Sequence, residues 1–108
     1  MDRKRMSEPD RRQTFLDGSE RAVVEVGRAL IGRGVYRPGW RWSEHVRPLA
    51  GKDAAEHTGL VLEGRLAVQG DDGRTMEVGA GEAFFVGPAH DAWVVGDEPC
   101  VALDFATT

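Results

Sequence analysis

The chain has 108 residues and a mass of 11.8 kDa, which is enough for one hydrophobic core but too little for two. Hydrophobic residues make up 41% of it and charged residues 30%, and no apolar run is long enough for a transmembrane helix. The formal net charge is -4 and the pI is close to 5.3, so the chain has no general attraction to a phosphate backbone. We expect a single-domain protein that stays in water and has neither nucleic acid nor a membrane as a partner.

The N-terminal residues 1–13, MDRKRMSEPDRRQ, carry many charges and lack the apolar stretch that a secretory signal needs. We expect residues 1–15 to form a flexible arm and residues 16–108 to form the domain. An arm that becomes ordered on a second subunit is the alternative. The only cysteine, Cys100, cannot form an internal disulfide, which suits a reducing compartment. The expected location is therefore the cytoplasm.

Short apolar runs follow the arm, separated by many of the 14 glycines and five prolines. This pattern is typical of an all-β sandwich or barrel. Asp72 and Gly73 can take the positive φ angles of a tight hairpin turn between two of the runs. No segment has a convincing apolar stripe at helical spacing. We expect strands at residues 21–26, 28–36, 40–46, 58–64, 65–70, 74–78, 83–87, 92–96 and 100–106.

Two segments, HTGLVLEGRLAV (57–68) and GAGEAFFVGPAHDAW (79–93), together resemble the two sequence motifs of the cupins. Gly64 matches the closing glycine of the first motif, and Gly81 matches the opening glycine of the second. The resemblance covers residues 38–105. It implies an antiparallel β-barrel of the cupin type, also described as a double-stranded β-helix or jelly roll, with a pocket in the mouth of the barrel.

The first motif departs from the family pattern at its polar positions. His57 stands where cupins usually carry a glutamate, and the histidine positions just upstream are absent. If the loop LAGKDAAE is an insertion, His45 matches the first of those histidines and Arg47 replaces the second.

The second motif departs from the pattern as well. Its histidine position is occupied by Ala92, and His90 precedes that position by two residues. Because side chains two residues apart point to the same face of a strand, His90 could still face the pocket.

The resemblance thus implies a metal site made of His45, His57 and His90, each at or near a pocket position. Imidazole nitrogens bind divalent zinc, iron, nickel and copper well, and manganese is a further possibility. We expect no organic cofactor. The alternative is that each histidine is an ordinary hydrogen-bonded or surface residue.

The stretch WRWSEHVRP (40–48) contains an objection to this site. On a strand, alternation would put Arg41, His45 and Arg47 on one face and Trp40 and Trp42 on the other, and core packing would turn the tryptophans inward. If a second subunit covers the tryptophans instead, the polar face points into the pocket. We favour this arrangement and expect a homodimer, in which both arginines bind a carboxylate-bearing ligand. The alternative is that the arginines pair with surface acids.

Four apolar residues of the later strands, Val61, Phe84, Phe85 and Trp93, are expected to fill the barrel. Trp93 is also a candidate for stacking on a bound ligand. Asp91 either caps a turn or orients the neighbouring histidine.

Three functions are compatible with these features. The first is a metal-dependent protein that binds or acts on a small organic molecule. The second is a metal-free module that binds or senses a small ligand without catalysis, and the third is a purely structural, dimerising domain. No catalytic triad, phosphate-binding loop or CxxC motif is present.

Overall fold

The computed structural model describes residues 1–108 and consists mainly of antiparallel strands, which confirms the all-β prediction. Both helices are too short and too polar to span a bilayer. In chain order the elements are β1 (Arg11–Thr14), β2 (Glu20–Val26), β3 (Ala29–Tyr36), α1 (Trp42–His45), α2 (Arg47–Ala50), β4 (His57–Glu63), β5 (Arg65–Gln69), β6 (Thr75–Gly79), β7 (Ala83–Val86), β8 (Asp91–Val94) and β9 (Cys100–Thr107).

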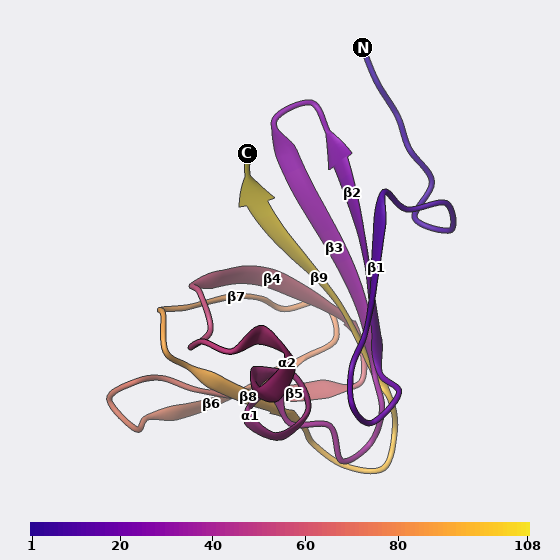
Figure 1. Cartoon of the computed structure of the whole chain (residues 1–108). Coiled ribbons are helices and arrows are strands. Elements are labelled where there is room, and N and C mark those ends of the chain that lie inside the picture. The colour runs from indigo at the N-terminus through magenta and orange to yellow at the C-terminus, as the bar shows by residue number, and fades with distance from the viewer.

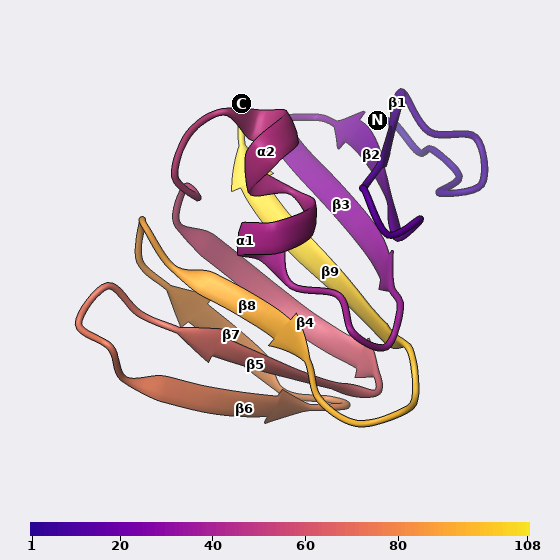
Figure 2. The ribbon, with the colours of Figure 1, turned by 60° about the horizontal axis from the view of Figure 1, so that its bottom comes forward.

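The strands form two sheets that face each other. Six strands pair in the order β1-β2-β3-β9-β4-β7, and three pair in the order β6-β5-β8 (Figure 1). Figure 2 shows the smaller sheet lying against the β4 side of the larger one, with α1 and α2 beside the space between β8 and β9. The chain crosses from the larger sheet to the smaller at Gly64, between β4 and β5.

The core lies between the two sheets and contains the side chains of alternate strand residues. Val61 and Cys100 are fully buried there, as the period of two predicts. Burial raises the pKa of the Cys100 thiol to about 11, so this cysteine is an inert core residue. The other core members are Trp40, Leu66, Val68, Val78, Val86, Ala92, Val94 and Ala102.

Two predicted core residues do not fill the barrel. Phe85 is 59% exposed, because β7 turns it to the outer face while its neighbour Phe84 points inward. Trp93 lies on the face of β8 opposite the buried Ala92, and the guanidinium carbon of Arg41 lies 4.5 Å from the centre of its ring. The prediction was wrong for these two and correct for Val61.

Eight of the nine predicted strands are present, with ends that differ by no more than two residues. The exception is the segment 40–46, which was predicted to be a strand and instead leads into α1. Asp91 causes this: its carboxylate accepts hydrogen bonds from the Ser43 backbone N–H and hydroxyl at 3.0 and 2.8 Å. It therefore satisfies an N–H group at the start of the helix, which has no partner within the helix.

Two further features of these segments were not predicted. Pro48 stands in the first turn of α2, where a missing N–H costs nothing, and Gly51 ends that helix with a φ of 70°. Residues 11–14, which were expected to belong to a flexible arm, form β1 and pair with β2.

Gly64 at the sheet crossing should tolerate no side chain. Its φ is +77°, and a Cβ atom there would collide with the backbone carbonyl oxygen of Pro99. Gly27 has a φ of +58° with nothing within 4 Å, so Gly27→Ala should cost only the left-handed backbone penalty, about 1–2 kcal/mol. Gly64→Ala should cost roughly 1–3 kcal/mol more, because the backbone must shift. Denaturant unfolding measures both, and equal costs would contradict this account of the crossing.

Candidate functional site

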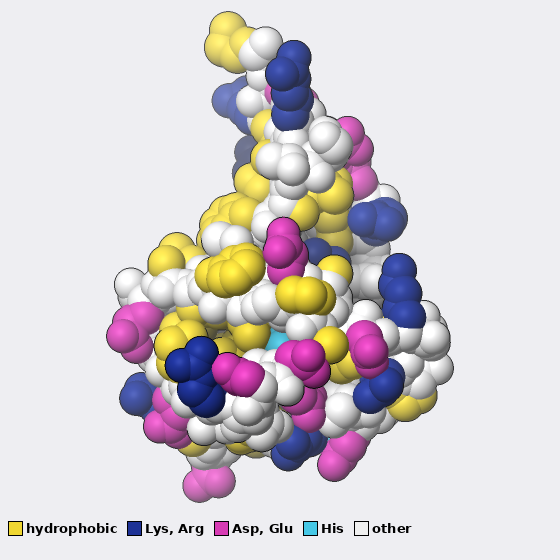
Figure 3. Space-filling model, turned by 90° about the vertical axis from the view of Figure 1, so that its left-hand side faces the viewer, with side chains coloured by type: hydrophobic (Ala, Val, Ile, Leu, Met, Phe, Trp, Pro, Cys, Tyr) yellow, Lys and Arg dark blue, Asp and Glu magenta, His cyan; other side chains and the backbone are white.

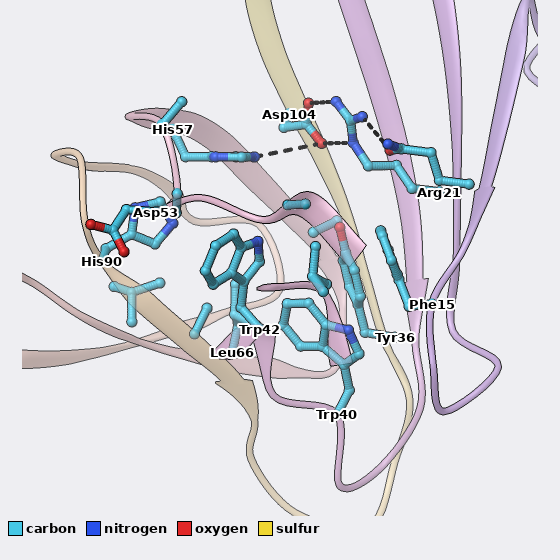
Figure 4. Close-up of a pocket in the computed structure, with 18 of the residues that line it drawn as sticks. Phe15, Arg21, Tyr36, Trp40, Trp42, Asp53, His57, Leu66, His90 and Asp104 are labelled. Atoms are coloured by element: carbon cyan, nitrogen blue, oxygen red, sulfur yellow. Dashed lines mark hydrogen bonds and ion pairs between the residues drawn. The ribbon is translucent and has the colours of Figure 1, made fainter. Parts of the chain in front are cut away.

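A cavity of about 240 Å³ lies between the two sheets. It has 21 lining residues, of which 14 are hydrophobic. Phe15, Tyr36 and Trp40 gather at one end, where the rings of Tyr36 and Trp40 are 4.3 Å apart between centres (Figure 4). His57 and His90 lie at the other end. The cavity is therefore an aromatic and aliphatic space with one polar end.

One wall of the cavity comes from the segment that contains the two short helices. Trp42, Val46 and Ala50 line it, followed by residues 52–55 of the loop before β4. Strand β8 holds this wall in place through Asp91, which accepts the hydrogen bonds from Ser43 and one from Arg41 Nε at 2.8 Å. Asp91 therefore caps a helical turn and does not orient His90.

Strand glycines make room for the larger side chains of the cavity. The Tyr36 ring lies over Gly34, so closely that a Cβ atom at Gly34 would overlap it. The Phe84 ring lies over Gly59 in the same way, and a Cβ atom there would be 2.7 Å from Cε1 of the ring. Glycine in the interior of a strand often marks such a close approach.

Asp104 on β9 is the one carboxylate buried in this region. It pairs in register with Gly32 on β3 and with Gly59 on β4, so neither neighbouring strand places a side chain beside it. Arg21 fills the space over Gly32 and donates two hydrogen bonds to the carboxylate, Nε to Oδ2 at 2.8 Å and Nη2 to Oδ1 at 2.5 Å. These bonds raise the pKa of Arg21, so its guanidinium stays charged.

His57 and His90 come together from β4 and from the loop before β8. Their ring centres are 5.5 Å apart and their planes are nearly perpendicular. Nε2 of His57 is 3.9 Å from Oδ2 of Asp104, which is too long for a hydrogen bond. Nδ1 of His57 is buried and has no partner. The two rings share one end of the cavity without bonding to each other.

The state of His90 follows from its single hydrogen bond. Its Nδ1 lies 2.8 Å from the carbonyl oxygen of Gly87, and a carbonyl can only accept, so Nδ1 carries the proton. Burial lowers the pKa of His90, and the nearby His57 lowers it further. At neutral pH the ring is uncharged, and its Nε2 carries a free lone pair.

The third predicted metal ligand, His45, does not line the cavity. It is the last residue of α1, and its Nδ1 accepts a hydrogen bond from the backbone N–H of Arg41 at 2.9 Å. The structure thus brings His57 and His90 together and leaves His45 apart. Arg41, between the two tryptophans, is extended, so Trp40 and Trp42 point to the same side and both line the cavity, as core packing favoured.

The three predicted ligand-binding residues also lie outside the cavity lining. Arg41 is bound to Asp91 and lies over Trp93. Arg47 pairs with Asp53 at 2.7 Å in an exposed ion pair. Both contacts agree with the alternative prediction, in which the arginines pair with acids instead of binding a ligand.

The reason given for a homodimer does not hold, since the tryptophans are covered within the chain. Trp40 is only 4% exposed, and Trp42 packs against the core. The homodimer itself stays a prediction.

The mouth of the cavity lies on the side of the β4–β7 edge and the loop that precedes β4. In the space-filling view of this side, histidine surface is visible only as a small area in a hollow, with acidic side chains beside it (Figure 3). Lys52 and Asp53 of that loop are both exposed cavity-lining residues. A small molecule would pass them to reach the histidines.

A model of the cupin domain family matches residues 42–106, which is more than half of the chain. The chain belongs to the cupin domain family. The resemblance inferred from the two glycine-rich motifs is therefore confirmed, and the two facing sheets are the double-stranded β-helix of that family. A search of curated proteins gave no match.

Several solved structures share the cupin fold of this chain. A protein of unknown function from Vibrio parahaemolyticus is 16% identical, with a TM-score of 0.65 over 87% of this chain and 95% of that one. KdgF from Halomonas sp. is 17% identical, with a TM-score of 0.64 over 91% and 86%. A sugar phosphate isomerase of the cupin superfamily from Silicibacter pomeroyi is 14% identical, with a TM-score of 0.67 over 91% and 71%. Likenesses at these identities show the fold alone.

The cavity of this cupin domain does not contain the donor set of a metal centre. No group of three or more histidine, cysteine, aspartate or glutamate side chains is placed to hold an ion. His90 has a suitable free Nε2, but both oxygens of Asp104 are held by Arg21, and His45 is elsewhere. Protein sites for zinc and similar ions use three or four ligands, and here two imidazoles are available.

Sequence reasoning missed Asp104 and Arg21, which form the polar end together with the histidines. A signal was present in the stretch CVALDFA. Asp104 is separated from Cys100 and Ala102 by an even number of positions, so all three point to the same face of the strand, which predicts an inward carboxylate. Such a group must be paired when it is buried. A search for an inward cation one strand beyond the neighbouring glycine Gly32 could then have found Arg21.

The stability of this cupin domain should fall as the pH drops from 7.5 to 5.5. The folded pKa of His90 lies below the unfolded value of about 6.5, so the unfolded chain binds more protons in this range and is favoured as the pH falls. Unfolding free energies measured across this range should vary less in His90→Asn than in the wild type. A wild-type stability that rises toward pH 5.5, or a pH dependence that His90→Asn leaves unchanged, would refute the assignment.

Removing the charge of Arg21 should destabilise the domain strongly. Arg21→Met keeps most of the apolar stem but leaves the Asp104 carboxylate buried without a partner, at a cost of about 3 kcal/mol. Arg47→Met breaks the exposed pair with Asp53 and should cost less than about 0.5 kcal/mol. Urea unfolding at pH 7.5 compares the two, and similar losses would show that the Arg21 pair has no special role.

Proposed function

We propose that this cupin domain binds a small, largely apolar organic molecule in the cavity between its sheets, without a metal ion. One observation carries the proposal: a largely apolar cavity of about 240 Å³ ends in two histidines, and neither makes a hydrogen bond to a charged side chain. Ligand sites in proteins have this character, with mostly apolar walls and a few placed polar groups.

The cavity argues against a purely structural domain. Protein interiors are packed to the density of organic crystals, and a small core seldom leaves a space of this size. Here strand glycines and bulky aromatic side chains enclose the space, and the two histidines lie together at one end. A binding role accounts for both features.

The charges in and around the cavity support a ligand that is neutral where it is buried. Arg21 is neutralised by Asp104, and Asp53 by Arg47 outside. The arginines expected to hold a carboxylate lie outside the lining, so only the exposed Lys52 at the mouth could meet one. An unpaired anion deeper inside would lose its hydration without compensation.

Benzene is a suitable first probe, because an apolar cavity of about 150 Å³ is known to take it up. Titration of the ¹⁵N-labelled domain with benzene should give saturable shifts in the amide signals of Val68, Ala92 and Ala102. Ala102→Leu fills part of the cavity and should weaken benzene binding at least about tenfold, which corresponds to a loss of about 1.4 kcal/mol of binding free energy. Ala106→Leu changes an exposed residue on the same strand and should leave the binding unchanged.

Elemental analysis of protein purified without chelator distinguishes the metal-dependent alternative. The free Nε2 of His90, with Nδ1 bound to a backbone carbonyl, is the arrangement that metal-binding histidines often have. The proposal expects far less than one ion per chain. One ion per chain that disappears in His90→Asn would favour the metal alternative, and cavity amides unmoved by millimolar benzene or phenol would overturn the binding function.

A further inference from the structure

His90 provides a hydrogen-bond acceptor that the protein leaves unused. The residue is 7% exposed and lines the cavity. Its Nδ1–H is committed to the Gly87 carbonyl oxygen, so the unprotonated Nε2 is the remaining polar atom of the ring. Nε2 has no hydrogen-bond partner within the protein, and a donor on a bound ligand would supply one.

His57 does not supply the missing donor from within the protein. The two rings meet edge to face, with centres 5.5 Å apart, and no hydrogen bond joins them. Asp104 is a pure acceptor when ionised, and Arg21 uses its donors on Asp104 and on Gln13. The polar end of the cavity therefore lacks a donor for Nε2 of His90.

The walls next to this acceptor suit a flat ring. Phe15, Tyr36 and Trp40 pack on one another at the far end. Trp42 and Phe84 also line the cavity; both pack against the core, and one face of the Phe84 ring lies over Gly59. Stacking of a ligand ring on the surfaces that face the cavity would add to the binding that burial of its area gives.

The size of the cavity limits the ligand to about one ring. An apolar cavity of about 150 Å³ takes benzene, so 240 Å³ takes one ring with a few further atoms. A sugar phosphate would bring two negative charges and several hydroxyl groups into a lining that is two-thirds hydrophobic, with only Lys52 unpaired. The structural neighbour from Silicibacter pomeroyi therefore shares the fold, and the lining here suits another class of ligand.

We propose, on the basis of the proposed function, that the ligand is a neutral single-ring aromatic compound whose hydroxyl group donates a hydrogen bond to Nε2 of His90. The ring lies among Trp42, Phe84 and the aliphatic side chains, and the hydroxyl group points to the histidine end. A phenol meets both conditions, because it has an apolar ring and one strong donor.

Four probes of similar size separate the parts of this proposal. Phenol has the ring and the donor, anisole has the ring without a donor, cyclohexanol has the donor without an aromatic ring, and benzoate carries a charge. In amide titrations of the wild-type domain, phenol should bind roughly three- to tenfold more tightly than anisole and cyclohexanol, the factor expected from one hydrogen bond or one stacking contact. Benzoate should bind weakest.

His90→Asn tests the acceptor directly. The shorter amide can still donate to the Gly87 carbonyl oxygen, but it has no atom at the position of Nε2. Phenol should then bind no better than anisole. His45→Asn makes the same chemical change outside the cavity and should keep the wild-type preference. Long-range ¹H–¹⁵N spectra of the wild type should also show Nδ1 protonated, and should show the Nε2 signal moving when phenol binds.

The outcomes separate this inference from the proposed function. If anisole or cyclohexanol binds as tightly as phenol, or His90→Asn keeps the preference for phenol, the hydroxyl proposal is wrong while the binding function stands. If benzene and all four probes leave the cavity amides unmoved, both are wrong. The comparison of probes uses the wild-type chain, so it remains decisive even if His90→Asn fails to fold.

Discussion

The ion pair between Asp104 and Arg21 constrains the rest of the site. A carboxylate between two sheets must be paired, and its neighbours across β3 and β4 are the glycines Gly32 and Gly59, which leave space on both sides. Arg21 reaches across β3 from β2 to fill one side, and the Phe84 ring lies over the other glycine. The pair thus ties β2 to β9 and sets the depth of the cavity at this end.

This pairing determines what the histidines can do. Both carboxylate oxygens are committed to Arg21, so Asp104 leaves His57 without a hydrogen bond and cannot serve as a third metal ligand beside the two rings. His90 takes its only partner from the backbone, which fixes its tautomer and leaves it uncharged. His90 therefore presents a neutral acceptor to the cavity, which suits a neutral hydrogen-bond donor better than an anion.

The sequence predicted the strands well and the site only in part, for a physical reason. Strand position depends on local alternation and turn residues, as the Asp72–Gly73 hairpin illustrates with a φ of +85° at Gly73. The helical turn at Trp42 depends on Asp91, a residue 48 positions from Ser43, which no local pattern contains. The tryptophans are covered within the chain and His45 lies outside the cavity lining, so it does not join the two histidines that line it.

The cupin scaffold can therefore change its chemistry without changing its strands. In this chain the sheets form the cupin barrel, and the segment between β3 and β4 folds into two helical turns, the first of which brings Trp42 to the cavity wall. A fold-level likeness says nothing about such a replacement, because the backbone of the barrel is the same in either case. The ligand must be inferred from the groups that face the cavity: a lining that is two-thirds hydrophobic, a neutral ion pair and one free imidazole nitrogen on His90. Together these groups favour a ligand that fits the shape of the cavity and carries a single hydrogen-bond donor. A metal centre would instead favour ligands that bring negative charge or lone pairs to the ion.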